Sequence, residues 1–388
     1  MDSLMTLAEV ADYLRLSRDK VCRMAQTGVI PAAKVGTQWR FRHEDVGSWI
    51  EDDENVGKKL EWGLRVGFPQ CQVRERAVSE GTAISYKFSG HQTFAFRYGW
   101  LEKGIHGVDE CATIFSEPDA IVRLGVGKNM VSSIRHWCHV TQLVEADPEV
   151  KGNRGCHLRA SEIGRRLLLD PAWDPFLEDD ASLWLIHWLL VSNPEIGTAW
   201  QLLFSKFHRP DFTRRELTAF VVSFLEKESL NVSDNVLNRD VDCLIRTYAG
   251  STSEKKKSTG IEEGFDCPLL ELHLIQPSPD GELYRFAIGP KPSLPPAVFA
   301  YALCQYFDRV AGKSSTLSVQ KCLYGAGSPG QAFKLDENSL ISYVEDLEDQ
   351  TASAMILDET AGLKQIYRRK PVDGLQTLDD YYRGSRLT

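Results

Sequence analysis

A chain of 388 residues, 43% hydrophobic and 10% aromatic, is long enough for two or three domains with cores of their own. No apolar run approaches the roughly 20 residues of a membrane span, and the opening MDSLMTLAEVADYL lacks the pattern of a signal peptide. Nine scattered cysteines without a Cys-x-x-Cys pair argue against a disulfide framework or a structural zinc site, and they favour a cytoplasmic protein with reduced thiols.

The net charge of −9 argues at first against a nucleic-acid partner, but the charge is unevenly distributed. Residues 15–42 contain seven Lys or Arg residues and one Asp. Acidic residues gather instead in 51–55, 177–180 and 343–350. The sequence therefore predicts a basic N-terminal module attached to an acidic body.

The first residues of this module predict two helices separated by a tight turn. Thr6 followed by Glu9 matches a capping box, in which each residue satisfies a free N–H group at a helix start. Ser17 is placed to cap a second helix that runs to Thr27, and Gly28 is a typical helix stop.

The next segment, VIPAAKVGTQWRFR, has two strand-like runs around Gly36 and Thr37, which predict a hairpin, and a short helix is expected at 44–50. Helix, turn, helix and hairpin form a winged helix-turn-helix, whose second helix enters the major groove. The residues expected at DNA are Arg18, Lys20 and Arg23 on the second helix and Lys34, Arg40 and Arg42 on the wing. Those expected in the core are Trp39, Phe41, Val46 and Trp49.

The whole stretch TLAEVADYLRLSRDKVCRMAQTGVIPAAKVGTQWRFRHEDVGSWI resembles the excisionase/MerR-like family of winged helix-turn-helix domains. The resemblance implies double-stranded DNA as the partner of residues 1–54. The alternative is a small helical module used for protein contact. The clustering of basic residues favours DNA.

Residues 55–84 are polar, broken by glycines and without sustained periodicity, which predicts a linker. A helical body is expected over 85–250, a mobile loop over 251–264 where apolar residues are almost missing, and the rest of the body over 265–388. There is no internal repeat of fixed period, although two stretches are typical of helix-turn-helix units.

The second of these stretches contains LGVGKNMVSSIRHWCH, residues 124–139, which raises the question of a nucleotide-binding loop. A P-loop requires Gly at 122 and Ser or Thr at 129, but the chain has Val122 and Asn129. The segment instead predicts a helix capped by Ser116 and opened by Pro118, a glycine turn, a longer helix and a hairpin.

We therefore expect a second helix-turn-helix near residues 115–145, with a helix pair used only for packing as the alternative. Its start is favourable for phosphate, because the first N–H groups of a helix are free. The residues expected at DNA are Lys128, Asn129, Ser132, Arg135 and His136.

The sequence contains only weak candidates for a metal-binding site. Pro118-Asp119 with Glu149-Val150-Lys151 has the letters of a nuclease motif, but the expected helix and turn make a chance match the better explanation. The acidic cluster of Asp174, Glu178, Asp179 and Asp180 is denser, yet it also suits the first turn of the apolar helix that follows.

Histidines offer three further candidates. His187, between two tryptophans, is expected to be a satisfied core residue, and His136 with His139 and Cys138 is a weak metal pattern. The polar residues of SGHQTFAFRYGW, which are His91, Gln92 and Arg97, suit a buried hydrogen-bond network or a DNA-backbone contact equally.

Several long blocks, including FSGHQTFAFRYGWLEKG, IFSEPDAIVRLGVGKNMVSSIRHWC and SPGQAFKLDENSLISYVEDLED, resemble the SspB-like family of bacterial DNA phosphorothioation gene clusters. This resemblance, over roughly residues 86–350, implies nicking of duplex DNA, dependence on Mg²⁺ or Mn²⁺, and cysteine-desulfurase and PAPS-reductase-like partners. It carries no identifiable catalytic residue.

The sequence thus predicts a mainly α protein with small β wings, which binds double-stranded DNA through an N-terminal winged helix and a second helix-turn-helix in a larger body. A nicking enzyme of a DNA phosphorothioation or phage-defence system is one interpretation, and a non-enzymatic DNA-binding adaptor or transcription regulator is the other. The target site and the choice between monomer and homodimer do not follow from the sequence.

Overall fold

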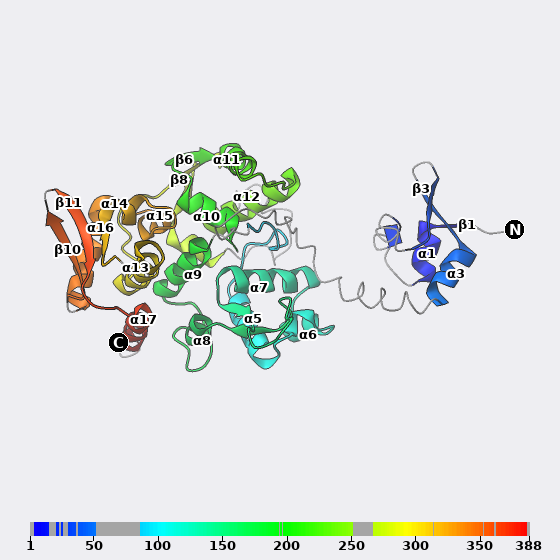
Figure 1. Ribbon diagram of the computed structural model, residues 1–388, viewed down its shortest axis with the longest axis horizontal. Coiled ribbons are helices and arrows are strands. Elements are labelled where there is room, and N and C mark those ends of the chain that lie inside the picture. The colour runs from blue at the N-terminus through cyan, green and yellow to red at the C-terminus, as the bar shows by residue number, and fades with distance from the viewer. Residues whose placement is uncertain are drawn as a thin grey trace. The chain divides into compact units, whose positions relative to one another are not determined.

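The computed structural model describes residues 4–14, 21–22, 25, 30–35, 38–51, 86–193, 195, 197–250, 267–312, 314–351, 353–360 and 362–385. The chain divides into two compact units, Met1–Gln70 and Cys71–Thr388. The linker expected at 55–84 and the loop expected at 251–264 lie outside the described residues. The described elements are mainly helices with small antiparallel sheets, which confirms the predicted fold class (Figure 1).

The N-terminal unit contains β1 (Leu4–Thr6), α1 (Leu7–Tyr13), β2 (Ala33–Val35), β3 (Gln38–Arg42) and α3 (His43–Glu51). The capping box is confirmed, since the Thr6 side chain accepts from the Glu9 N–H and the Glu9 carboxylate accepts from the Thr6 N–H. The hairpin and the last helix are also confirmed. Strand β1, which the sequence did not predict, pairs with β3 to give the order β1-β3-β2.

The core of this unit includes Phe41 and Val46, with Trp39 and Trp49 packed against it, as expected. The second helix is described only in part, through the buried Val21 and Ala25 and the half-buried Cys22.

The body begins with α5 (Trp100–Glu110), the 3-10 helix η1 (Ile114–Ser116), α6 (Ala120–Leu124), α7 (Lys128–Val140), β4 (Val144–Ala146), β5 (Leu158–Ala160) and α8 (Glu162–Leu168). The order of short helix, glycine turn, longer helix and hairpin is the one predicted. Helix α6 is shorter than expected, because Ser116 ends η1 and the chain becomes α-helical only at Ala120. Gly125 then caps α6 with φ +64°, a left-handed conformation that favours glycine.

The middle of the body contains α9 (Asp180–Ser192), α10 (Thr198–Ser205), β6 (Asp211–Thr213), α11 (Arg214–Lys227), α12 (Asp234–Ala249), the 3-10 helix η4 (Pro268–Leu272), β7 (Ile275–Pro277) and β8 (Leu283–Phe286). The last part contains α13 (Pro296–Ala311), β9 (Thr316–Ser318), α14 (Val319–Tyr324), α15 (Pro329–Phe333), α16 (Glu337–Gln350), β10 (Met355–Thr360), β11 (Leu363–Arg368) and α17 (Gly374–Ser385).

One topology recurs through the body. Helix, strand, helix, helix and hairpin follow one another from α10 to β8 and again, with α15 inserted, from α13 to β11. In both cases the first strand pairs with the last, giving the orders β6-β8-β7 and β10-β11-β9. The segment from α5 to β5 differs only in its first strand, which is reduced to a single bond from the Leu158 N–H to the Ala112 carbonyl at 2.8 Å.

We call these the first unit (residues 100–160), the second unit (198–286) and the third unit (296–368). Each has the strand order of a winged helix, as does the N-terminal unit. Their sequences share no obvious pattern, so the repeat becomes visible only in the structure. The helices that correspond to the DNA-reading helix of a winged helix are α7, α12 and α16.

Helix α9 holds the body together. Every residue from Ala181 to Ser192 is buried, because the helix is apolar on all sides and packs against α10, α13, α15 and η4. Among the described residues, no helix combines the length and the apolar character needed to cross a membrane.

Candidate nucleic-acid interface

Helix α7 is held firmly on its inner side. Val131, Ile134 and Trp137 are buried, and the Trp137 indole N–H donates to the Phe94 carbonyl at 3.0 Å. Gly104 lets α5 approach closely, since a Cβ there would lie 2.3 Å from Cys138 Sγ. The inner face of α7 is thus apolar, and the opposite face is left for polar residues.

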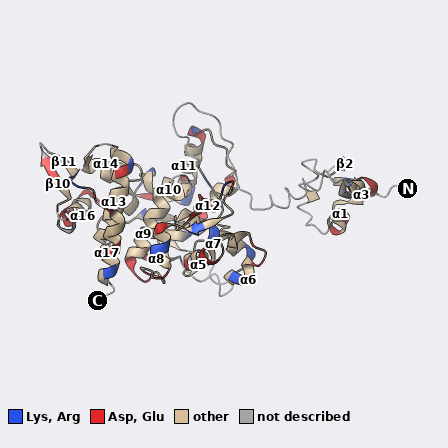
Figure 2. Ribbon diagram, turned by 60° about the horizontal axis from the view of Figure 1, so that its bottom comes forward, with Lys and Arg blue, Asp and Glu red and all other residues tan. Residues whose placement is uncertain are grey.

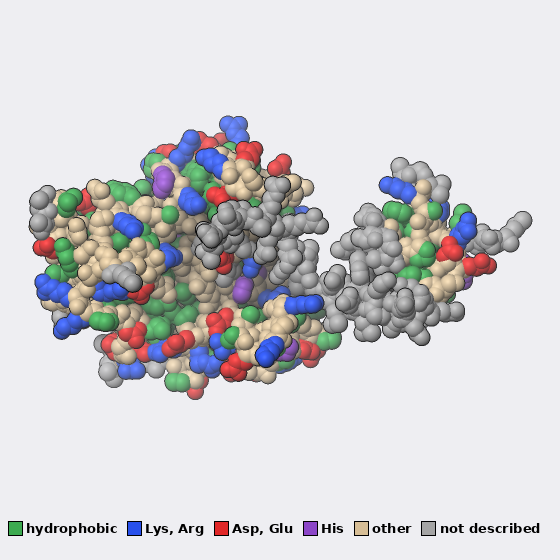
Figure 3. Space-filling view, in the orientation of Figure 1, with side chains coloured by type: hydrophobic (Ala, Val, Ile, Leu, Met, Phe, Trp, Pro, Cys, Tyr) green, Lys and Arg blue, Asp and Glu red, His purple; other side chains and the backbone are tan. Residues whose placement is uncertain are grey.

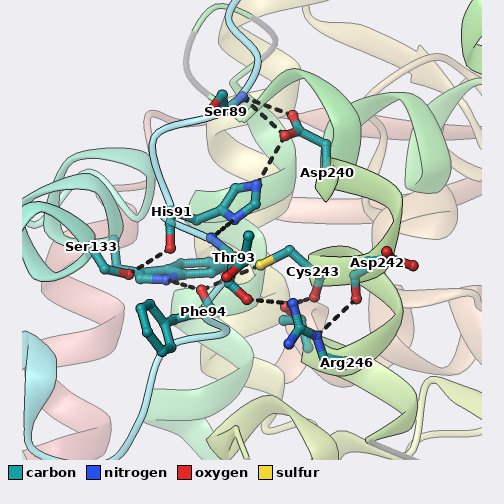
Figure 4. A network of polar contacts seen from close by, with 11 residues as sticks. Ser89, His91, Thr93, Phe94, Ser133, Asp240, Asp242, Cys243 and Arg246 are labelled. Carbon is teal, nitrogen blue, oxygen red and sulfur yellow. Dashed lines mark hydrogen bonds and ion pairs between the residues drawn. The ribbon is translucent and has the colours of Figure 1, made fainter. Parts of the chain in front are cut away.

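The segment 89–94 locks α7 to α12 through a network of polar contacts (Figure 4). The Asp240 carboxylate accepts from the Ser89 N–H at 3.0 and 2.9 Å and contacts His91 Nε2 at 2.9 Å. The Thr93 N–H donates to His91 Nδ1, which makes Nε2 the donor of the neutral ring to Asp240. The Ser133 hydroxyl of α7 donates to the His91 carbonyl at 2.9 Å.

His91 and Asp240 are only 1% and 2% exposed. Of the two roles left open for the SGHQTF segment, the structure supports the buried hydrogen-bond network for His91. Arg97 lies over the rings of Phe94 and Trp100. Neither Asp240 nor Cys243 could be predicted as part of this network, because both lie about 150 residues further along the chain. The Cys243 thiol donates to the Phe94 carbonyl at 3.3 Å.

The outer face of α7 carries residues at positions 128, 132 and 135, which form one stripe because they are four and three residues apart. Lys128 is exposed at the helix start, and Asn129 beside it is exposed as well. The Ser132 hydroxyl donates to the Lys128 carbonyl at 3.4 Å. Arg135 is half-buried and donates to the Gly155 carbonyl at 2.8 Å, in the loop between β4 and β5.

His136 follows Ser132 by four residues and lies at the edge of this stripe, where the helix meets the segment before α5. Its ring faces the 90–91 segment, where a Cβ on Gly90 would lie 2.5 Å from Nδ1, and its Nε2 is buried. Burial lowers the pKa of this imidazole well below its usual value, so the ring is neutral. The contact expected between His136 and DNA stays a prediction, but the geometry favours a packing role.

In the N-terminal unit, Lys34 and Arg42 are exposed and Arg40 is half-buried on β2 and β3. Arg18, Lys20 and Arg23 lie outside the described residues. Their predicted contacts with the major groove therefore rest on the sequence alone.

The acidic cluster does not form a metal site in the structure. Asp174 and Glu178 do not share a helix face; Asp174 instead accepts from the N–H groups of Glu178 and Asp179 and from the Ser182 hydroxyl. Asp179 caps α9 and accepts from Tyr381. These carboxylates line an open hollow of about 850 Å³ beside Pro292–Pro296 and Tyr382. The contacts therefore support a structural role for this cluster at the start of α9.

The other candidate ligands are dispersed. His187 is a satisfied core residue, since its ring contacts the Tyr248 hydroxyl at 2.7 Å and the Ala332 carbonyl at 2.8 Å. Cys138 points into the core while His139 contacts the Val144 carbonyl. Within the described parts of the chain, no three His, Cys, Asp or Glu residues come together in a way that could hold a metal ion. These residues therefore do not fit a Mg²⁺ or Mn²⁺ site.

The three corresponding helices differ in charge and exposure. Helix α7 has Lys128 and Arg135 and no acidic residue. Helix α12 buries Asp240 and seven further residues, partly under segment 89–94. Helix α16 carries five acidic residues and no Lys or Arg.

In Figure 2, blue segments lie on α7 and red segments on α16. Acidic and basic side chains are interspersed over the face of the body shown in Figure 3, so a contact with a polyanion has to be local. Among the three helices, α7 is the one with basic and no acidic residues, whereas α12 combines Arg239 and Arg246 with three Asp residues, so the charge of α7 suits DNA best.

Comparisons with known proteins agree with this architecture. Residues 4–53 match a helix-turn-helix domain. The body is similar to two solved structures, a magnesium ion-bound SspB crystal structure and a second SspB crystal structure. Each is 28% identical, has a TM-score of 0.69, and covers 77% of this chain and 88% of the solved chain. No curated protein matches the sequence.

The resemblances predicted from the sequence blocks are thus confirmed for both parts of the chain. Residues 88–382, which include all three winged-helix units, match the family described as a protein of unknown function, DUF4007. The chain belongs to the DUF4007 family and carries an N-terminal helix-turn-helix domain.

Proposed function

We propose that this protein binds double-stranded DNA at two places, the N-terminal winged helix and the α7 face of the first unit, as part of a bacterial DNA phosphorothioation system. The observation that carries the proposal is the outer face of α7, where the exposed Lys128 and the half-buried Arg135 lie on a firmly packed helix that has no carboxylate. The helix-turn-helix match and the similarity to SspB structures support the same class of partner.

The first N–H groups of α7 add to this face. Gly127 precedes the helix without a side-chain cap, so these N–H groups are available to a phosphate oxygen next to the Lys128 ammonium. Phosphate contacts of this kind supply affinity and orientation, whereas sequence is read from base edges by groups such as Asn129.

Electrophoretic mobility shifts over a series of salt concentrations test the binding. Arg18→Ala with Arg23→Ala in the N-terminal unit is expected to weaken duplex binding and to flatten its salt dependence, because fewer counterions are released. Binding that stays unchanged across the series would remove the N-terminal unit from the interface.

The finer proposal is that DNA is nicked for sulfur insertion, with Mg²⁺ or Mn²⁺ and with cysteine-desulfurase and PAPS-reductase-like partners. The carboxylates of the described residues do not fit a metal site, so we derive no cleavage step. The carboxylate oxygens of Asp174 and Asp179 already accept hydrogen bonds from the chain itself. This favours the second candidate, a non-enzymatic adaptor or regulator that holds DNA for a sulfur-transfer partner.

Supercoiled plasmid separates the two candidates. Purified protein with Mg²⁺ or Mn²⁺ converts plasmid to open circles in a manner that EDTA abolishes if the chain nicks DNA. Intact plasmid together with a persistent gel shift supports the adaptor. The absence of any shift at low salt contradicts DNA binding altogether.

A further inference from the structure

The loop between β4 and β5 of the first unit, residues 147–157, has a rigid frame. The Asn153 side-chain amide donates to the carbonyls of Asp147 at 2.9 Å and His157 at 2.7 Å, and its oxygen accepts from the His157 N–H at 2.7 Å. The Asp147 N–H donates to the His157 carbonyl at 3.0 Å. The tip of the loop therefore leaves the hairpin in a defined direction.

The tip itself has the sequence KGNRG, residues 151–155. Lys151 and Arg154 are exposed, and neither forms an ion pair with a residue that the structure describes. Gly152 has φ +70°, and a Cβ there would have no neighbour within 4 Å, so the backbone is open to an approaching ligand. The two acidic residues of the loop, Asp147 and Glu149, precede the tip, and the Asp147 carboxylate accepts from the Glu149 N–H.

The loop tip is hydrogen-bonded to the outer face of α7. Arg135 of α7 donates to the Gly155 carbonyl at 2.8 Å. Arg135 lies seven residues, or two turns, from Lys128, so both point to the same side of the helix. The loop tip therefore contacts the same side of α7 on which Lys128 lies, and the two belong to one surface.

The corresponding loops of the other units lack these features. In the second unit the loop from β7 to β8 contains Asp280 and Glu282 and no Lys or Arg, and Ser278 and Asp280 close it as a tight turn. In the third unit the strands next to the loop carry Asp358 and Glu359 on one side and Lys364, opposite Glu359, on the other, so the charges are mixed. Of the three hairpins, the one beside α7 is the one with a cationic tip.

We propose that residues 151–155 form a second phosphate-binding element, which holds the backbone of duplex DNA beside the groove that α7 enters. Lys151 and Arg154 neutralise phosphates, and Gly152 lets the backbone of the loop approach them. The ligand is the sugar–phosphate backbone, so this element contributes affinity and position with little sequence preference. The inference rests on the proposed DNA binding by the first unit.

Charge removal at the tip tests the element in the full chain. Lys151→Gln with Arg154→Gln is expected to lower duplex affinity about tenfold at moderate salt and to reduce the slope of log K against log salt by about 1 to 2. Arg369→Gln with Lys370→Gln, which removes the same charges from exposed positions just after the third unit, is the matched control and is expected to change affinity less than about twofold. Lys151→Arg with Arg154→Lys keeps the charges and is expected to restore binding.

The exposed Cys156 beside the tip provides an independent readout in the unmodified protein. Iodoacetamide alkylation of Cys156, followed by peptide mass spectrometry, is expected to slow several-fold in the presence of duplex and to recover at high salt, where the duplex dissociates.

Equal alkylation with and without duplex, together with an unchanged affinity of the Lys151 and Arg154 variant, overturns the loop element. If Lys128→Ala weakens binding in the same assays, the proposed function survives that result. If the wild-type chain shows no shift at low salt, the proposed function itself fails.

Discussion

The first and third units of the body share a strand order and a succession of elements, yet they present opposite charges at the same position of the fold. Helix α7 has two basic residues and no acid, whereas α16 has five acids and no base. The hairpin loops also differ, with Lys151 and Arg154 at the tip of one, and Asp358, Glu359 and Lys364 beside the other. A winged-helix topology therefore does not by itself indicate a DNA contact.

In the second unit, the helix that would read DNA in a winged helix has a structural task instead. Its helix α12 is built into the core, and Asp240 on it receives bonds from segment 89–94, which also holds α7. The second unit thus supports and positions helix α7 of the first unit.

Four predictions test these different roles of the three units.

The largest effect is expected where the second unit supports the first. Asp240→Ala leaves the Ser89 N–H and the His91 ring N–H without their partner in a buried site, and we expect the free energy of unfolding of the body to fall by about 2–5 kcal/mol. Urea unfolding followed by tryptophan fluorescence measures the loss.

Asp242→Ala, two residues further along α12, is the matched control. Asp242 pairs with Arg214 at the surface, where the two side chains are 40% and 51% exposed, so its removal is expected to cost less than about 1 kcal/mol. Similar losses for the two variants would contradict the supporting role of Asp240.

The second effect concerns the third unit, whose core contains a buried lysine. Lys334 donates to the Phe204 carbonyl at 3.2 Å and lies over the Phe286 ring, and burial lowers its pKa to about 7. Since the unfolded chain keeps the usual pKa near 10.5, it binds more protons between these values, and stability contributed through Lys334 rises with pH in this window.

The expected gain from pH 7 to pH 9 is about 2 kcal/mol, and Lys334→Met is expected to abolish it. Unfolding curves of both chains at the two pH values measure the difference. A wild-type stability that is no more dependent on pH than that of the variant would mean that Lys334 stays charged in the folded chain.

The third effect lies on α7. Lys128→Ala with Asn129→Ala removes a cation and a polar group from the helix start, and we expect duplex affinity to fall by about 1–2 kcal/mol with a smaller salt slope. Fluorescence anisotropy of a labelled duplex measures both quantities. Lys370→Ala, just after the third unit, is the control, and equal losses for the two variants would show that only net charge matters.

The smallest effect is expected on α16. Glu345→Gln with Asp346→Gln removes two exposed carboxylates, and if this helix lies away from DNA the affinity should change by less than about 0.3 kcal/mol. A clear gain in affinity would place α16 near phosphates and would erase the distinction between the units.

Local patterns in the sequence predicted the elements that are fixed by local contacts. The capping box of Thr6 and Glu9, the hairpin of β2 and β3, and the succession of α6, Gly125 and α7 were all visible in short stretches. Helix α9 was marked by its apolar run and by the acidic residues before it.

What the sequence did not reveal depends on long-range pairing. Strand β1 consists of three residues whose partner, β3, lies more than thirty residues away. Asp240 becomes important only because the fold brings it to Ser89 and His91. The three units of the body resemble one another in backbone hydrogen bonding but not in amino-acid sequence. The sequence therefore contains no recognisable repeat.

Lysine acetylation of the full chain, with and without saturating duplex, tests most directly whether α7 rather than the end of the third unit meets DNA. Both Lys128 on α7 and Lys370 just after the third unit are exposed, so both react in the free protein. We predict that duplex protects Lys128 and leaves Lys370 fully reactive. Protection of Lys370 with continued modification of Lys128 would contradict the account.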